Sequence, residues 1–224
     1  MPQALNERAK ATPAQQGSLA NHHAGTLVLG LTGAMAAGKS TLAAWFKARH
    51  VPVFDADATV RALRTPGQPG ALGVARILPA VMAPGGGVDM ALLRAHLKAH
   101  PEMLPQLEGI FHPLVAQARR RFIKRCVGQG AKLCVLDIPL LWETGADKDC
   151  DGVMVADAPL DVRLARLAQR AAQGGMAVDQ ARALMARQTS PAEARARANW
   201  VVDTGGSVAH AGSQLEAFMN GLCN

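Results

Sequence analysis

The sequence contains no tyrosine, few aromatic residues and only four cysteines. Aromatic residues make up 4% of its 224 residues, which argues against recognition of single-stranded nucleic acid by base stacking, because that mode needs exposed rings. The cysteines form no C-x-x-C pair, so neither a zinc site nor a disulfide framework is indicated. Reduced thiols in a cytoplasmic protein are the simplest interpretation.

Long apolar runs are also absent. None approaches the roughly 18 residues that a membrane-spanning helix requires, and residues 1–25 lack the apolar segment of a secretory signal. We therefore expect no membrane partner and a cytoplasmic location. Residues 1–25 are mostly polar and small and are predicted to be a disordered tail.

The net charge of +7 allows two interpretations. One is a surface that attracts polyphosphate ligands or nucleic acid. The other is a compositional bias toward alanine and arginine that runs along the whole chain. The composition alone leaves both open.

The pattern G-x-x-x-x-G-K-S occupies Gly33 to Ser40, which is a complete phosphate-binding loop. A β-rich run, Thr26 to Thr32, precedes it, and a helix-like run, Ser40 to Arg49, follows it, as this motif requires. A loop wound into a helix N-terminus points several N–H groups into one concavity that binds phosphate oxygens. Lys39 is expected to reach the β- and γ-phosphates of ATP, and the Ser40 hydroxyl to ligate Mg²⁺.

The phosphate-binding loop contains three alanines, which is unusual for this motif. Ala34, Ala36 and Ala37 stand where many such loops carry Gly or Ser, and an alanine at a position with positive φ would be strained by about 1 kcal/mol. The expected nucleotide contacts are Gly33, Ala34, Met35, Ala36, Ala37, Gly38, Lys39, Ser40 and Thr41.

Two further predicted strands end in carboxylates. Residues 51–54 form one strand and run into Asp55-Ala-Asp57; residues 132–136 form another and run into Asp137. In a parallel sheet, ligands bind at the edge where strands end. Asp57 is interpreted either as a general base or metal-shell ligand, or as a helix cap. Asp137 either holds a magnesium-bound water or is a structural cap.

Between these two strands lies a block of helical pattern without a strand. The block spans residues 65–130 and suggests an inserted substrate-binding subdomain. Pro101 and Pro113 both stand where a helix could restart. The basic run Arg119 to Arg125 is interpreted as a solvated helix face, with contact to a phosphorylated ligand as the alternative.

The rest of the chain alternates strands and helices. Strands are predicted over residues 151–156 and 199–202, and a long helix that starts at Pro159 carries Arg163, Arg166 and Arg170. A Gly174-Gly175 break follows. Arginines on a hinged helical hairpin are typical of a lid that closes on phosphates, although an arginine-rich solvated helix is the alternative for each one. Further helices are predicted to Gln188, from Pro191 to Arg197 and to Leu222.

Together these residues resemble the dephospho-coenzyme A kinase family from about Leu27 to Leu222. The P-loop alone indicates a superfamily, whereas the other landmarks make the likeness specific. They are Leu31-Thr-Gly33 with Gly38-Lys-Ser-Thr41; Asp55-Ala-Asp57 with Arg61; Leu107-Glu108 and His112-Pro113; Pro139-Leu-Leu141 with Glu143; Arg166 and Arg170; Gln188; and Val202-Asp-Thr-Gly205.

The resemblance implies ATP-dependent phosphorylation of the 3′-hydroxyl of dephospho-CoA. It implies an α/β fold: a three-layer α/β/α P-loop kinase core (residues 26–64 and 131–222) with a five-stranded parallel sheet, a helical CoA-binding insertion (65–130) and a helical lid (170–198). Nucleic acid is not an expected partner, and the chain is expected to be a monomer or a small homo-oligomer.

The resemblance also implies roles for single residues. Asp57 matches the family's base and also belongs to the substrate set, and Arg170 belongs to the lid. With Lys39 these two form the expected catalytic group. Thr204 and Gly205 fall near the adenine of ATP. The other expected substrate-binding residues are Arg61, His112, Pro139, Leu140 and Leu141.

Three positions depart from the family's usual residues. Ala36 stands in place of Gly, Met90 in place of Arg, and Arg163 in place of Gln, so the resemblance assigns no role to Met90 or Arg163. Two alternatives remain open. One is another small-molecule kinase, such as a nucleoside or shikimate kinase. The other is a nucleotide switch or nucleic-acid-associated ATPase, although the N-K-x-D element of a GTPase is absent.

Overall fold

The computed structural model describes residue 23, residues 25–174, residue 185 and residues 188–222. The chain forms two compact units: the first contains the residues up to Val53 and those from Gly130 on, and the second is Phe54–Gln129. The lid stretch predicted between Gly174 and Gln188 falls mostly on residues 175–184 and 186–187, and the predicted tail on residues 1–22 and 24, all outside the described residues. In the described part of the chain, no helix is long and apolar enough to cross a bilayer.

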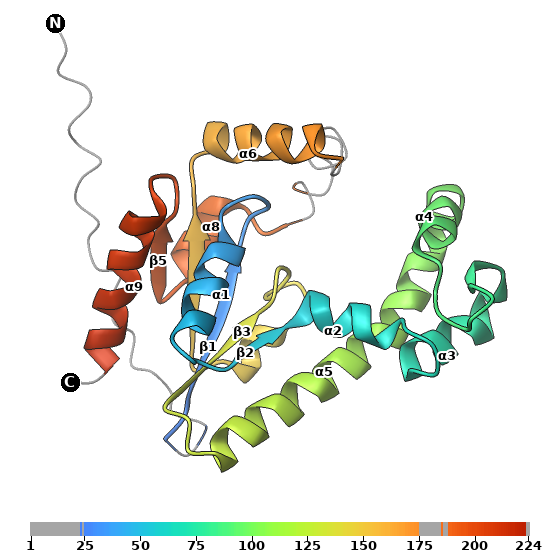
Figure 1. Cartoon of the computed structure of the whole chain (residues 1–224), viewed down its shortest axis with the longest axis horizontal. Helices are drawn as coiled ribbons and strands as arrows, with labels where there is room; N and C mark the ends of the chain where they lie inside the picture. The colour runs from blue at the N-terminus through green and yellow to red at the C-terminus, as the bar shows by residue number, and fades with distance from the viewer. Residues whose placement is uncertain (1–22, 24, 175–184, 186–187, 223–224) are drawn as a thin grey trace, which may run out of the picture. The chain divides into compact units, whose positions relative to one another are not determined.

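A five-stranded sheet has the strand order β2-β3-β1-β4-β5 (Figure 1). The β1–β3, β1–β4 and β4–β5 pairs are parallel. The α/β fold and the five strands are as predicted, but each strand begins and ends one or two residues later than its predicted range. At the carboxyl ends of four strands, Gly33, Asp137, Asp157 and Asp203 still pair in the ladder. The strands are β1 (Leu27–Gly33), β2 (Val53–Asp55), β3 (Leu133–Asp137), β4 (Gly152–Asp157) and β5 (Trp200–Asp203).

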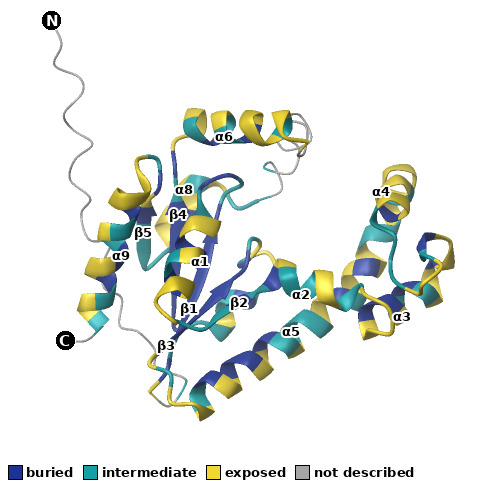
Figure 2. Ribbon diagram, viewed as in Figure 1, coloured by how far each residue is buried: buried dark blue, intermediate teal, exposed yellow. Residues whose placement is uncertain are grey.

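One face of the sheet carries the main core of the first unit. Helices α1 (Lys39–Ala48) and α9 (Val208–Leu222) pack there, and their Phe46 and Phe218 rings meet edge to face at 6.4 Å. Strands alternate their side chains between the two faces, so every second strand residue enters this core. The strands are buried along most of their length (Figure 2). The strand residues of this core are Leu29, Leu31, Leu133, Val135, Met154, Ala156 and Val202.

The opposite face of the sheet is buried as well. A Cβ added at Gly30 would lie 2.9 Å from the Cys150 sulfur and 3.0 Å from a Leu141 methyl group, so this position has no room for a side chain. Helix α8 (Pro191–Arg197) packs against β4, and α6 (Leu160–Ala172) follows β4 in the chain. Burial on both faces explains why the strands read as continuous apolar runs.

The second unit is helical, as predicted for this part of the chain. It contains α2 (Ala56–Leu63), α3 (Pro69–Ile77), α4 (Met90–Ala99) and α5 (Leu104–Gly128), with α2 and α3 packed against α5. Met90, at a position where the family usually has Arg, packs at the edge of this unit's core. The buried core residues are Val74, Leu78, Val81, Leu93, Leu107 and Phe111.

Helix α5 does not restart at Pro113, contrary to the sequence expectation, and runs through it. A proline inside a helix leaves the carbonyl four residues earlier without its usual N–H partner. Here that carbonyl belongs to Gly109, which is exposed and has nothing within 4 Å of a Cβ position, so water can hydrogen-bond it. The other proposed restart is confirmed, because α4 ends at Ala99 and a 3₁₀ turn begins at Pro101.

Candidate nucleotide-binding site

The loop between β1 and α1 begins and ends with glycines that the surrounding backbone requires. A Cβ at Gly33 would lie 2.6 Å from the Ala156 carbonyl oxygen in β4. Gly38 has φ 94°, in the left-handed region, and a Cβ there would approach Thr204 to 3.1 Å. Gly38 is the N-cap residue of α1, so the loop winds directly into the helix N-terminus, as the phosphate-binding motif predicts.

Ala36 also has a left-handed backbone, with φ 61°, whereas neither Ala34 nor Ala37 does. This conformation costs an alanine about 1 kcal/mol relative to glycine. The Ala36 side chain is only 8% exposed and packs in a small apolar cluster with Leu167 of α6. The loop therefore keeps the left-handed turn without a glycine at its centre, and α6 covers it.

Two arginines of α6 hold the backbone of this turn. Arg163 Nε donates to the Met35 carbonyl oxygen at 3.0 Å, and Arg166 Nη1 donates to the Ala36 carbonyl oxygen at 3.2 Å. Arg163 is 4% exposed. Burial lowers the pKa of its guanidinium, and the nearby Asp157 carboxylate opposes that shift. Both arginines therefore contact the loop backbone and are not simply part of a solvated helix face, while their place in a lid stays a prediction.

Thr204 supports the next peptide of the loop. Its hydroxyl oxygen is within hydrogen-bond distance of the Ala37 carbonyl oxygen and lies 2.7 Å from the Asp157 carbonyl oxygen. The hydroxyl has a single proton, so it donates to one of these oxygens at a time. Arg166 Nη2 donates to the Thr204 carbonyl oxygen at 2.6 Å, which joins this support to α6. The carbonyl groups of three successive loop residues are therefore hydrogen-bonded from outside the loop.

Gln188 contacts the loop from the chain segment before α8. The Met35 N–H donates to Gln188 Oε1 at 2.9 Å. Gln188 was a landmark of the family resemblance without an assigned role. The sequence could not reveal this contact, because the partner of Gln188 is a backbone N–H group, which every residue except proline has.

Lys39 and Asp137 form an ion pair at the start of α1 and the end of β3. The Lys39 side chain is 16% exposed and that of Asp137 9%. Sequence reasoning placed Asp137 near the loop but named a magnesium-bound water or a cap as its role. The ammonium of the P-loop lysine is the partner that the structure gives it.

The Pro139-Leu-Leu141 segment lies directly after β3. Thr32 Oγ1 donates to the Pro139 carbonyl oxygen at 3.1 Å. Leu140 is 40% exposed, whereas Leu141 is fully buried against Gly30. A small, open hollow lies between this segment and the start of the loop, and Gly33, Ala34, Pro139, Trp142, Glu143 and Thr189 are among the residues that line it.

Residues of the second half of the predicted lid (170–198) lie on one side of this hollow. Glu143 Oε1 accepts hydrogen bonds from the Thr189 N–H at 2.6 Å and from its hydroxyl at 2.9 Å. The Arg197 guanidinium lies 4.8 Å from the centre of the Trp142 ring. The Glu143 landmark therefore joins Thr189, within the predicted lid range, to the segment that follows β3.

Thr204 and Gly205, expected near adenine, form the turn between β5 and α9. The Gly205 N–H donates to Asp203 Oδ1 at 2.8 Å. A Cβ at Gly205 would lie 2.6 Å from Pro159 Cδ, so the turn and the start of α6 pack too closely for a side chain. Because Thr204 also supports the loop, this turn is tied to the phosphate site.

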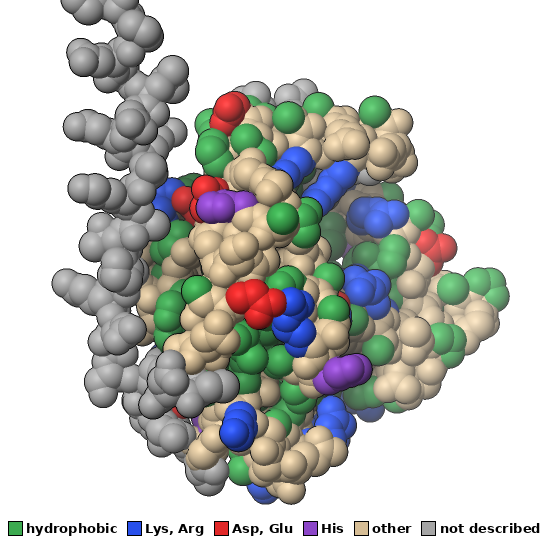
Figure 3. Space-filling model, turned by 60° about the vertical axis from the view of Figure 1, so that its left-hand side comes forward, with side chains coloured by type: hydrophobic (Ala, Val, Ile, Leu, Met, Phe, Trp, Pro, Cys, Tyr) green, Lys and Arg blue, Asp and Glu red, His purple; other side chains and the backbone are tan. Residues whose placement is uncertain are grey.

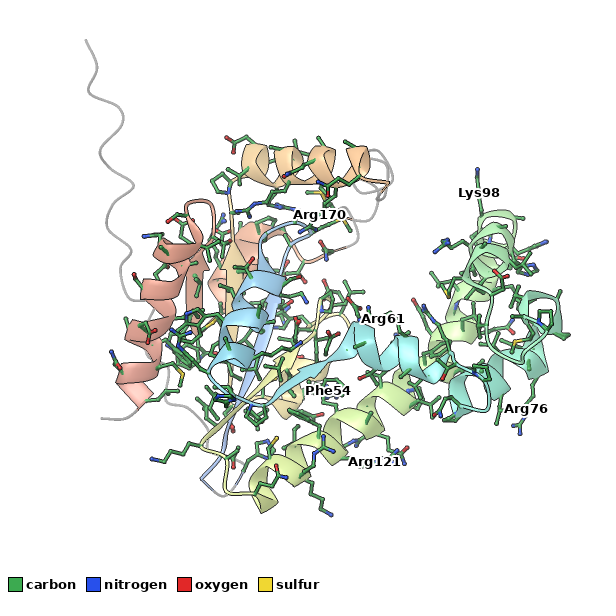
Figure 4. The ribbon with its side chains drawn as sticks, in the orientation of Figure 1. Phe54, Arg61, Arg76, Lys98, Arg121 and Arg170 are labelled. Carbon is green, nitrogen blue, oxygen red and sulfur yellow. The ribbon has the colours of Figure 1, made fainter. Side chains whose placement is uncertain are left out.

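The second unit holds the Asp55-Ala-Asp57 element. Asp55, and not Asp57, caps α2, because Asp55 Oδ1 accepts a hydrogen bond from the Ala58 N–H at 2.7 Å. Asp57 is exposed in the first turn, and Arg61 projects from the same helix (Figure 4). The cap interpretation of Asp57 is therefore wrong, and its carboxylate is accessible to solvent.

Arg64 and His112 lie further along the helices of the second unit. Arg64 places its guanidinium over the Phe111 ring at 5.4 Å. Burial lowers the pKa of Arg64; the Asp57 charge opposes this shift and the Arg61 charge adds to it. His112 is exposed on α5, directly after the buried Phe111.

Basic residues also occur at several other places in the described part of the chain. In the predicted solvated run on α5, Arg119 is 8% exposed, and Arg121 donates to Gln117 Oε1 at 2.6 Å. Lys and Arg side chains form separate spots among uncharged surface on the face shown in Figure 3. Arg170 is exposed in the last turn of α6 (Figure 4).

A parallel sheet whose central strand runs through a phosphate-binding loop into a helix defines the class of P-loop kinase folds. The dephospho-CoA kinase family matches residues 27–210. The chain therefore belongs to the dephospho-CoA kinase family. It is a kinase, its phosphoryl donor is ATP, and the resemblance inferred from its motifs is confirmed.

Individual relatives agree with this assignment. The chain is similar to the dephospho-CoA kinase of Gluconobacter oxydans, with 49% identity over 200 residues that cover 87% of this chain and 97% of the relative. A Jannaschia dephospho-CoA kinase is 41% identical over 179 residues, 80% and 89% of the two chains. The crystal structure of TT1252 from Thermus thermophilus has a TM-score of 0.72 at 31% identity and covers 88% of this chain and 98% of its own.

Proposed function

We propose that this chain transfers the γ-phosphoryl group of ATP to the 3′-hydroxyl of dephospho-CoA, the last step of coenzyme A biosynthesis. The observation that carries the proposal is the β1–α1 loop, whose carbonyl groups are held outward at the N-terminus of α1. A relative that is 49% identical is named a dephospho-CoA kinase, which supports dephospho-CoA as the acceptor.

In this proposal the residues Gly33 to Thr41 bind the triphosphate. The Lys39 ammonium, which leaves Asp137 to do so, and N–H groups of the loop such as that of Ala36 neutralise phosphate charge. The N–H groups of Met35 and Ala37 donate instead to Gln188 Oε1 and the Ala34 carbonyl oxygen. Ser40 is the second residue of α1 and is exposed. Its hydroxyl is an oxygen ligand of the kind that Mg²⁺ prefers. When bound, Mg²⁺ would neutralise charge that develops between the β- and γ-phosphates.

We assign the binding of the acceptor to the residues that the family resemblance implies. Asp57 accepts the proton of the attacking hydroxyl, an effect of typically 10²–10⁴-fold on rate. Its exposure and the use of Asp55 as the cap support this role, because the Asp57 carboxylate is not needed by the helix. The remaining acceptor contacts are Arg61, His112 and the Pro139-Leu140-Leu141 segment, and residues 65–130 supply the CoA-binding surface.

Thr204 and Gly205 border the adenine of ATP, and Arg170 neutralises the transferring phosphoryl group from the lid, residues 170–198. Exclusion of water matters here, because an open site would hydrolyse ATP instead of phosphorylating the acceptor. Most of the rate then comes from positioning and charge neutralisation. We propose that the chain works as a monomer or a small homo-oligomer without nucleic acid.

A coupled ATP-consumption assay with dephospho-CoA tests this function. We expect ADP formation that depends on dephospho-CoA and on Mg²⁺, with coenzyme A identified by mass spectrometry. Shikimate and nucleosides serve as alternative acceptors in parallel reactions. Faster turnover of one of these, or ATP hydrolysis that ignores the acceptor, would contradict the proposal.

A further inference from the structure

Arg163 is a buried cation directly beside the phosphate-binding loop. It lies on the first turns of α6 and is 4% exposed. Its Nε donates to the Met35 carbonyl oxygen at 3.0 Å. The proposed function uses Lys39, Ser40 and Arg170 and leaves Arg163 without a role.

The hydrogen bond from Arg163 sets the orientation of the peptide group between Met35 and Ala36. A trans peptide points its carbonyl and its N–H in opposite directions. Because the Met35 carbonyl is held toward α6, the N–H of Ala36 in the same peptide points to the other side of the loop. An N–H group on that side is available to a phosphate oxygen.

The same peptide leads into the strained residue of the loop. Ala36 has φ 61°, a conformation that a residue with a Cβ disfavours. Its methyl group is buried against Leu167, one turn after Arg163 on α6. Helix α6 therefore holds the turn through a polar contact before Ala36 and an apolar contact at Ala36.

The neighbouring charges leave Arg163 as a cation close to the loop. Asp157 opposes the burial-induced lowering of the Arg163 pKa. Asp157 also accepts from Arg195 Nη1 with both carboxylate oxygens, each at 3.0 Å. The Asp157 carboxylate thus interacts with the guanidinium groups of Arg163 and Arg195. Of these two, Arg163 is the one that donates a hydrogen bond to the loop.

We propose that Arg163 is a positioning residue for nucleotide phosphates, which holds the left-handed turn at Ala36 in the conformation that presents its N–H to the triphosphate. The inference rests on the proposed binding of ATP at this loop. It predicts that Arg163 matters for the phosphates of a nucleotide and not for its nucleoside.

The test measures dissociation constants for ATP, ADP and adenosine by calorimetry, with adenosine measured by competition. For Arg163→Gln we expect roughly tenfold weaker binding of ATP and ADP, since a hydrogen bond from a charged donor is lost, and adenosine affinity within twofold of the parent. Arg195→Gln is the matched control, because it removes the other guanidinium at Asp157 without touching the loop, and it should leave all three constants unchanged.

A second substitution tests the link to Ala36. Glycine adopts the left-handed conformation without strain, so Ala36→Gly combined with Arg163→Gln should recover at least about half of the lost ATP affinity on a logarithmic scale. Circular dichroism checks folding, and if Arg163→Gln does not fold, Arg163→Lys, which keeps the cation but not Nε, replaces it in both experiments.

Three results would overturn the inference: unchanged ATP affinity in the Arg163 variants, an equal loss for adenosine, or no recovery with Ala36→Gly. Failure of the parent protein to bind ATP would instead refute the proposed function, so the two failures are distinguishable.

Discussion

The Lys39 ammonium forms an ion pair with the Asp137 carboxylate, across 98 residues of sequence. Both side chains are largely buried, so the pair is screened weakly by solvent. Lys39 is the first residue of α1, directly after the phosphate-binding loop, and Asp137 is the last residue of β3, which pairs with β1. Lys39 therefore has Asp137 as a structural partner in addition to the phosphates that it is proposed to bind. Substitution of Lys39 should consequently affect both stability and turnover.

Lys39→Ala should lower turnover at least about 100-fold, as removal of a group that stabilises transition-state charge typically does. It should also lower the free energy of unfolding by about 1–3 kcal/mol, because Asp137 keeps a largely buried charge without its ammonium partner. Steady-state kinetics and chemical denaturation measure the two effects. Lys47→Ala, an exposed lysine of the same helix, should change neither.

A double variant separates the two roles of Lys39. Asp137→Asn in the Lys39→Ala background should restore part of the stability, because the largely buried negative charge that lost the Lys39 ammonium is removed, while turnover stays low. Near-normal turnover in Lys39→Ala would refute the assignment of the P-loop.

Asp57→Asn should lower turnover far more than it weakens ATP binding. The substitution removes a proton acceptor but leaves the Asp55 cap of α2 in place. Comparison of kcat with the dissociation constant for ATP measures this difference. Asp89→Asn is the control in the same unit, since asparagine also caps a helix such as α4. A variant that chiefly loses ATP affinity would make Asp57 a metal ligand instead of a base.

Gly33→Ala should lower the melting temperature, because the new Cβ would lie 2.6 Å from the Ala156 carbonyl oxygen. Overpacking of this kind typically costs about 1–3 kcal/mol. Gly109→Ala is the matched control, since this glycine is exposed within α5 with open space around it. It should stabilise the protein by about 0.5–1 kcal/mol. Equal melting temperatures for the two variants would contradict the packing of β1 against β4.

Thr204→Val should destabilise the protein by about 1–3 kcal/mol and weaken ATP binding. Valine has nearly the same shape, but it cannot donate to the Ala37 or Asp157 carbonyl oxygens. Thermal denaturation with and without ATP measures both effects. Thr65→Val loses an exposed hydrogen bond to the Ala62 carbonyl oxygen, which water can replace, and should be nearly neutral.

The strands and the phosphate-binding loop were predictable because they depend on local signals. Strands buried on both faces read as apolar runs, and the loop needs Gly33 and Gly38 at positions that no other residue fills easily. The later ends of the strands were not predictable, since a polar residue such as Asp137 still pairs in the ladder at the sheet edge.

The side chains that hydrogen-bond the loop backbone could not be predicted from local signals. Arg163 and Gln188 bind backbone groups of Met35, and a backbone partner has no residue type that a pattern could match. Likewise, the passage of α5 through Pro113 depends on the exposure of Gly109, which only the packed structure defines. The residue that caps α2 is Asp55 and not Asp57. The sequence could not distinguish them, because both residues have the same side chain.

The hydrogen-bonded carbonyl groups of Met35, Ala36 and Ala37 have a consequence for selectivity. A loop whose peptide planes are already oriented loses little conformational entropy when a ligand arrives. Such a loop responds to the charge and length of a triphosphate chain and is indifferent to the base attached to it. If Thr204 and Gly205 border the adenine as proposed, that short turn is the place to redesign the nucleotide preference of the enzyme.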